Sequence, residues 1–237
     1  DGRYLAFLSL ERAGFEADRA RLMVRDRQSG QVREVTRNWD YPIGEYAWAP
    51  GGHDFFAQAD KRQRNVLLHI VFETGEVHQI LTDMNPGQIT VAATTGAPTL
   101  AFVSDATNKP AEVFTWVVDR RQAPRQLTHL TDARVANLAM NPAREFGWMG
   151  AAGDSMFGLL LMPPNFDASS RYPVVILVHG GPQGAWIDQF HGRWNYQMFA
   201  APGYVVALLN PRGSTGFGQR ITDQISIDES EIEESFV

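Results

Sequence analysis

The sequence predicts an all-β part made of repeated antiparallel sheets, followed by an α/β part with a parallel sheet. Two observations carry this prediction. A short segment that ends in an aliphatic residue and a threonine recurs at a constant interval over residues 1–136. After about residue 140, continuous apolar runs are separated by a helix-like pattern. We therefore divide the chain into residues 1–136, residues 137–225 and an acidic tail at 226–237.

Three similar units make up residues 1–136. They end in Val35-Thr36, Leu81-Thr82 and Leu127-Thr128, and these endings lie 46 residues apart in both cases. Each unit opens with a polar turn and a short apolar strand, and another strand, a turn and a last strand follow. A period in the mid-forties with several short strands per unit is typical of a β-propeller blade. The alternative, a meander with chance spacing, accounts poorly for two equal intervals.

The repeat does not complete a ring. A propeller closes with about four to eight blades, and the sequence holds three such units. The first unit begins in its opening turn, at Asp1-Gly2. We therefore expect an incomplete ring, with the N-terminal part of the protein absent from this chain.

The residues after 140 predict a βαβ unit. Gly158–Met162 is a short apolar strand, and Val174–Val178 is a continuous β-branched run that suits a strand buried on both faces of a parallel sheet. Tyr204–Leu209 predicts a second buried strand. The segment 189–201 between them predicts a crossover helix, because three of its apolar residues share one helix face: Phe190, Trp194 and Met198. Strand, helix and strand in this order indicate a parallel sheet.

Composition and charge exclude several classes of protein. The chain has no cysteine, which excludes disulfides, thiolate metal sites and cysteine nucleophiles. Of the net charge of −6, five acidic residues fall in 226–237 without a base, so the rest offers no basic face for nucleic acid. Neither a membrane span nor a signal peptide is visible. We expect no cofactor, no metal and no nucleic acid; the compartment and the oligomeric state stay open.

The loop after the first buried strand is the candidate site. It reads His179-Gly180-Gly181-Pro182-Gln183-Gly184 and leaves the carboxyl end of a strand, where open α/β sheets place ligands. Adjacent glycines let bare N–H groups approach a ligand, and acyl transfer needs such donors for its oxyanion. We interpret Gly180 and Gly181 as oxyanion-hole donors and His179 as a loop residue; a glycine-proline turn is the alternative. Gly181→Val is expected to lower turnover with little effect on thermal stability.

A second glycine-rich loop, residues 210–218, follows the next strand. A phosphate cradle is a weak alternative here, because neither the dinucleotide fingerprint nor the P-loop motif is met. Ser214 stands in Arg-Gly-Ser-Thr-Gly and not in a Gly-x-Ser-x-Gly elbow, so it predicts a turn residue and not a nucleophile. We interpret Arg212 as a structural cation that pairs with a carboxylate; a position that lines the site is the alternative.

Two stretches around these loops resemble the prolyl oligopeptidase family of serine peptidases, and most closely its acylaminoacyl-peptidase and bacterial dipeptidyl-peptidase-like branch. They read YPVVILVHGGPQGAW and RWNYQMFAAPGYVVALLNPRGSTGFGQ. The resemblance implies β-propeller blades before an α/β-hydrolase domain, a Ser-Asp-His triad and a peptide substrate. It covers the repeats in architecture only. Because the chain has no Gly-x-Ser-x-Gly and the triad histidine would come last, the resemblance places the whole triad beyond this chain, which we expect to be inactive by itself.

Two functions stay open at this point. The first is a serine oligopeptidase, of dipeptidyl or acylaminoacyl type, whose propeller restricts access to the cleft. The alternative is a propeller binding module fused to a non-catalytic α/β domain. The tail at 226–237 departs from the family pattern, and we expect it to be exposed because five uncompensated acids are costly to bury.

Overall fold

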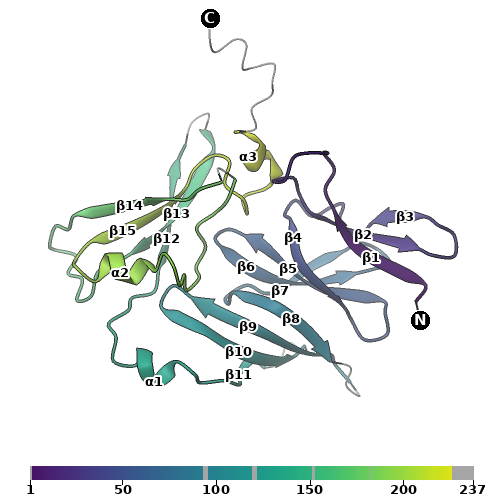
Figure 1. The fold of residues 1–237 in the computed structure, drawn as a ribbon, viewed down its shortest axis with the longest axis horizontal. Coiled ribbons are helices and arrows are strands. Elements are labelled where there is room, and N and C mark those ends of the chain that lie inside the picture. The colour runs from purple at the N-terminus through teal and green to yellow at the C-terminus, as the bar shows by residue number, and fades with distance from the viewer. Residues whose placement is uncertain (1, 93–95, 119–121, 151–152, 182, 226–237) are drawn as a thin grey trace, which may run out of the picture.

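The computed structural model describes residues 2–92, 96–118, 122–150, 153–181 and 183–225. Three antiparallel sheets follow one another along the chain, and a fourth, mixed sheet comes after them (Figure 1). The acidic tail, for which exposure is predicted, lies outside the described residues.

The first three sheets are built from strands that are consecutive in the chain. The first sheet contains β1 (Tyr4–Ser9), β2 (Arg21–Asp26) and β3 (Val32–Glu34). The second contains β4 (Ile43–Trp48), β5 (Asp54–Lys61), β6 (Arg64–Val71) and β7 (Val77–Leu81). The third contains β8 (Pro86–Ala92), β9 (Thr99–Ala106), β10 (Lys109–Val117) and β11 (Arg125–Gln126), and the short helix α1 (Asp132–Val135) follows it.

The recurring threonine makes the same kind of hydrogen bond in the first and third sheets. The Thr36 hydroxyl accepts a hydrogen bond of 3.0 Å from the amide of Leu22 in β2. The Thr128 hydroxyl accepts one of 2.8 Å from the amide of Val113 in β10. Each threonine satisfies a strand amide at the point where the last strand of its sheet ends, so the sequence repeat reflects a repeated corner.

Neighbouring sheets share hydrophobic cores, because the two faces of the second sheet are both buried. In β5, Phe55 packs with residues of the first sheet and Phe56 with residues of the third. In β6, Leu68 and Leu67 divide between the same two cores. Alternation of side chains along a strand thus places one residue in each core.

The opening strands β4 and β8 are missing from the sequence prediction, which begins the second and third units at β5 and β9. Both opening strands contain an irregularity in their pairing, between Ile43 and Glu45 in β4 and between Gly87 and Thr90 in β8. Such a bulge breaks the two-residue alternation by which a strand is read from sequence.

The fourth sheet has the order β12-β13-β15-β14. Its strands are β12 (Arg144–Met149), β13 (Ser155–Leu161), β14 (Val174–Val178) and β15 (Val205–Asn210). The helices α2 (Tyr196–Ala200) and α3 (Gln219–Asp223) accompany it. The β14 strand runs parallel to β15, with α2 between them in the chain, whereas β12, β13 and β15 pair antiparallel. In the described part of the chain, no helix has the length and apolar character that a membrane crossing requires.

Two details of the predicted βαβ unit are wrong. The β14 strand is not buried on both faces: it lies at the sheet edge, and Val178 is 74% exposed. The helix covers five residues in place of 189–201, because the Asn195 side chain caps it by accepting a hydrogen bond from the Gln197 amide. Trp194 therefore precedes the helix, and Met198 is 71% exposed.

Candidate functional site

The loop 179–184 starts where β14 ends, beside the carboxyl end of β15. Within it, Gly181 has a φ of +143°, and a Cβ atom there would lie 2.6 Å from the backbone nitrogen of Gln183. Gly180 has open space around the same position. The backbone at Gly181 thus favours glycine, and from this geometry we expect Gly181→Val to lower the thermal stability, in contrast to the expectation from the sequence.

The described residues of this loop, 179–181 and 183–184, form a tight arc in which Gly184 lies close to Gly180 and to the His179 ring. A Cβ atom at Gly184 would lie 2.9 Å from the carbonyl oxygen of Gly180 and 3.4 Å from His179 Nδ1. The Nδ1 atom lies 3.1 Å from the same carbonyl oxygen. Among the described residues, no acceptor receives the amide hydrogen of Gly181. In the described part of the loop, the arc therefore presents a backbone donor without a protein acceptor.

The second glycine-rich loop packs directly against this arc. Thr215 donates a backbone hydrogen bond of 2.9 Å to the carbonyl oxygen of Gly184. Ser214 is fully buried, and its hydroxyl donates to the carbonyl oxygen of Pro211 at 2.6 Å. The ring nitrogen Nε2 of His179 lies 3.0 Å from the same hydroxyl oxygen. Ser214 is therefore a buried turn residue, and sequence reasoning did not anticipate its contact with His179, 35 positions away.

The second sheet reaches the same loops through the turn between β5 and β6. The Arg62 amide donates a hydrogen bond of 2.9 Å to the carbonyl oxygen of Gly216. The Asp188 amide donates one of 2.7 Å to the carbonyl oxygen of Gln63. The Arg64 guanidinium pairs with the Asp188 carboxylate at 3.3 Å. The turn between β5 and β6 is thus bound both to the loop 210–218 and to the segment around Asp188.

The third sheet makes equivalent contacts through the turn between β9 and β10. The Thr107 amide donates to the Asp188 carboxylate at 2.9 Å, and Gln197 in α2 donates to the Thr107 carbonyl oxygen. The Asp105 carboxylate accepts from the Phe190 amide at 3.0 Å. Burial raises the pKa of Asp105 above its ordinary value. Asp188 therefore binds both the second and the third sheet.

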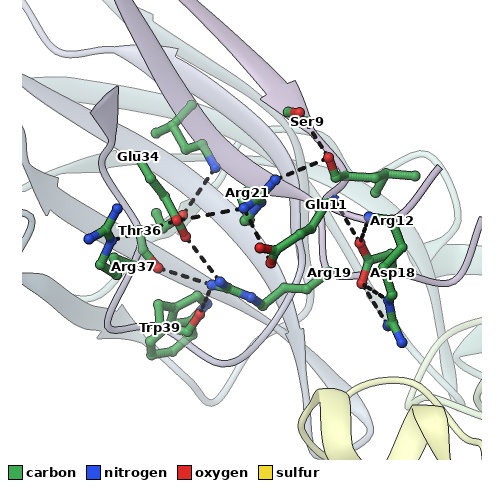
Figure 2. Close-up of polar contacts among 12 residues, drawn as sticks. Ser9, Glu11, Arg12, Asp18, Arg19, Arg21, Glu34, Thr36, Arg37 and Trp39 are labelled. Carbon is green, nitrogen blue, oxygen red and sulfur yellow. Dashed lines mark hydrogen bonds and ion pairs between the residues drawn. The ribbon is translucent and has the colours of Figure 1, made fainter. Parts of the chain in front are cut away.

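The first sheet approaches the helix α3 by a charged contact. Arg12 pairs with Asp18 and with Asp223 of α3, both at 2.7 Å. Figure 2 shows Arg12 and Asp18 in this loop, with Arg19 directed toward Glu34 of β3 at 3.0 Å beside it. The charged side chains of this region are largely satisfied by each other, so we assign them to the structure of the loop.

Arg212 is held by a carboxylate, in agreement with its interpretation as a structural cation. Asp154 accepts hydrogen bonds from Arg220 at 2.7 Å, from Gln224 at 2.8 Å and from Arg212 at 3.1 Å. The Arg220 bond comes first among the contacts that lower the pKa of Asp154 to about 2. Asp154 thus ties the β12–β13 connection to α3 and to the loop that contains Ser214.

A cavity of about 550 Å³ lies elsewhere, at the third sheet, where Asp105, Lys109 and Glu112 are among its lining residues. The Glu112 carboxylate is bound by the Thr128 hydroxyl and by the amide and hydroxyl of Thr131, the latter two at 2.8 Å. These bonds, with that from Thr128 the largest, lower its pKa to about 2. Because the Glu112 carboxylate already accepts these hydrogen bonds, we assign it a structural role. We therefore do not place the candidate functional site at this cavity.

The chain matches no protein-family model. It is 29% identical over 234 residues to dipeptidyl-peptidase 5 of Schizosaccharomyces pombe, covering 96% of this chain and 33% of that protein. It is also 29% identical over 230 residues to dipeptidyl-peptidase 5 of Porphyromonas gingivalis, with the same coverage of both chains. The chain thus spans about one third of the length of these curated relatives.

Solved structures share the fold. The Pyrococcus horikoshii acylaminoacyl peptidase superposes with a TM-score of 0.74 at 20% identity, over 95% of this chain and 33% of that chain. A puromycin-hydrolyzing peptidase of Mycobacterium tuberculosis superposes with a TM-score of 0.66 at 17% identity, over 95% and 34%. The successive antiparallel sheets match propeller-like blades, as the repeat predicted. Relatives in sequence and neighbours in fold agree: both groups are peptidases, and they support the resemblance of the chain to the prolyl oligopeptidase family.

Proposed function

We propose that this chain is part of a serine peptidase, in which it supplies propeller blades, the first strands of an α/β-hydrolase domain and the oxyanion loop. The observation that supports this proposal most directly is the amide of Gly181, which has no acceptor among the described residues and lies in a glycine arc at the carboxyl end of β14. Backbone donors in such a position stabilise the oxyanion of an acyl-transfer intermediate. The relatives named dipeptidyl-peptidase and acylaminoacyl peptidase supply the reaction class.

The rest of the machinery is assigned by resemblance. The resemblance places the catalytic serine, aspartate and histidine, in that order, beyond this chain in a longer protein. The exposed apolar side chains of β14, Val174, Ile176 and Val178, lie on one face of the sheet, which suits a face that a further layer of the longer protein covers. His179 and Ser214 do not form a nucleophile–base pair, because Ser214 is buried and its hydrogen is bound to Pro211.

The test uses the full-length protein and this chain side by side. Both are treated with a fluorophosphonate probe and with two fluorogenic peptides, one with a free N-terminal amine and one with an acylated N-terminus. We expect the full-length protein to be labelled and to cleave one peptide, while the 237-residue chain does neither. Labelling of the short chain at any serine, or a full-length protein inert to probe and peptides, contradicts the proposal; the second result favours the non-catalytic binding module.

A further inference from the structure

The hydrogen bonds around Ser214 determine which atoms of His179 carry hydrogen. A serine hydroxyl has one hydrogen, and a proline carbonyl oxygen can only accept. The 2.6 Å contact with the Pro211 carbonyl therefore uses the hydrogen of Ser214. The 3.0 Å contact with His179 Nε2 is then a hydrogen bond only when Nε2–H donates to the hydroxyl oxygen. Ser214 thus holds the imidazole ring by its Nε2–H group.

The far side of the same ring faces the peptide that joins Gly180 and Gly181. Its Nδ1 lies 3.1 Å from the carbonyl oxygen of Gly180. This oxygen can only accept, so the contact is a hydrogen bond when Nδ1 carries a hydrogen in addition to the one on Nε2. In a trans peptide the C=O and N–H bonds point in opposite directions. A Gly180 carbonyl turned toward the ring therefore turns the Gly181 amide away from it, where it meets no described acceptor.

We propose that Ser214 is a positioning residue for the oxyanion loop: it fixes the His179 ring, and the ring sets the direction of the Gly181 N–H. This inference rests on the proposed function. Ser214 touches neither substrate nor reacting atoms, and it acts through His179. A donor that is turned away from the developing charge loses most of its effect on the transition state, because that effect depends on geometry.

The backbone around Ser214 is held in place by several hydrogen bonds, so the serine can fix the position of the His179 ring. Its own carbonyl oxygen accepts a hydrogen bond of 3.2 Å from the hydroxyl of Thr222 in α3. Its neighbour Thr215 binds the arc at Gly184, and Gly216 binds the second sheet at Arg62. The serine is thus attached to the packed body of the protein on one side and to the candidate loop on the other.

The first experiment compares two hydroxyl deletions in the full-length protein. Ser214→Ala removes the contact with His179, whereas Thr222→Val removes a hydroxyl of α3 that binds the Ser214 backbone and does not contact His179. For Ser214→Ala we expect kcat to fall by about 10- to 100-fold, less than or equal to the loss of one oxyanion donor, with KM within about twofold. For Thr222→Val we expect a lower melting temperature and a kcat within about twofold.

The second experiment tests whether Ser214 acts through His179. His179→Phe keeps a ring but removes both nitrogens. In a His179→Phe background, adding Ser214→Ala should change kcat by less than about twofold, since the two residues work as one unit. If the two losses multiply, Ser214 does not act through the ring and the inference is overturned.

A spectroscopic measurement separates positioning from a loss of folding. In side-chain ¹H–¹⁵N spectra of histidine-labelled protein, with His179 identified by His179→Phe, we expect a hydrogen on Nε2 that Ser214→Ala abolishes or makes exchange rapidly. An unchanged His179 signal, or a kcat loss no larger than that of Thr222→Val, overturns the inference while the proposed function stands. A wild-type full-length protein without peptidase activity overturns both.

Discussion

The backbone amide of Arg62 lies 2.9 Å from the carbonyl oxygen of Gly216, and this hydrogen bond joins the second sheet to the loop that carries Ser214. The Arg62 guanidinium also lies over the Phe157 ring of β13, 5.1 Å from its centroid. The turn between β5 and β6 is thus packed against the fourth sheet and against its loop. The shape of the candidate site therefore depends on a sheet that, among the described residues, contributes no side chain to the candidate loop itself.

Loss of the Asp188 side chain should weaken the docking, that is, the packing of the second and third sheets against the segments of the candidate site, most clearly. Asp188→Ala removes the acceptor of the buried Thr107 amide and the partner of Arg64. A buried donor left without a partner costs about 1–3 kcal/mol, so we expect the free energy of unfolding to fall by about that amount. Urea unfolding of the 237-residue chain, followed by tryptophan fluorescence, measures it.

Asp188→Asn is the matched control for that change. Its amide oxygen can still accept from Thr107, while the charge opposite the partly exposed Arg64 is lost. We expect a clearly smaller loss of stability, because a partly exposed ion pair contributes little. Equal losses for the two variants would show that the charge pair, and not the Thr107 hydrogen bond, holds the docking.

The repeated corner makes a second prediction. Thr36→Val removes the acceptor of the Leu22 amide in the core of the first sheet, and both residues are fully buried. We expect a loss of about 1–3 kcal/mol in the free energy of unfolding. Thr74→Val serves as the control, since the exposed Thr74 hydroxyl accepts from Glu76 in a surface turn. Similar urea midpoints for the two variants would argue against a structural role of the repeated threonine.

The two glycines of the candidate loop should differ in their effect on stability. Gly181→Ala forces a side chain into a φ of +143° and against the Gln183 backbone, so we expect a loss of about 1–3 kcal/mol. Gly180→Ala points into open space and should change the stability by less than about 0.5 kcal/mol. Thermal unfolding of both variants measures the difference. A larger loss for Gly180→Ala would mean that the described arc is not the native one.

The lowered pKa of Asp154 leads us to expect a loss of stability in acid. Its pKa is about 2 in the folded chain against an ordinary 3.8, so the unfolded chain binds the proton more readily. The stabilising contribution is therefore complete above the ordinary pKa and disappears as the pH falls from about 4 to 2. Asp154→Asn should flatten this part of the profile of urea midpoint against pH. An unchanged slope in the variant would assign the acid sensitivity to other carboxyl groups, of which Glu112 has a similarly lowered pKa.

A strand can be predicted from the sequence when its own residues, such as a run of β-branched side chains, favour the extended conformation. The bounds of β14 agree with the predicted Val174–Val178, because a run of β-branched residues between a proline and a glycine loop has few other conformations. Its position at the sheet edge could not be read from the same residues, since an apolar strand has the same composition at an edge and in a centre. The helix boundary failed for a local reason, because the cap at Asn195 outweighs the apolar spacing that precedes it.

In the candidate site, too, the sequence predicts the local features and not the contacts between distant residues. A glycine loop after an apolar strand locates Gly180 and Gly181, since both signals are local. The contacts that shape the loop come from positions far away in the chain, such as Ser214 and the turn at Arg62. No spacing rule connects these residues to His179, because their proximity arises only when the sheets pack together.

The two faces of β5 also limit how related chains can differ in length. Phe55 fills one core and its neighbour Phe56 fills the other, so one residue inserted before them would turn each ring toward the wrong core. Two cores would be disrupted by a single insertion. The surface turns, in contrast, can grow without exchanging any side chain between faces. Length variation among relatives should therefore be concentrated in the turns, and a gap within β5 in an alignment would indicate an alignment error before it indicated an evolutionary event.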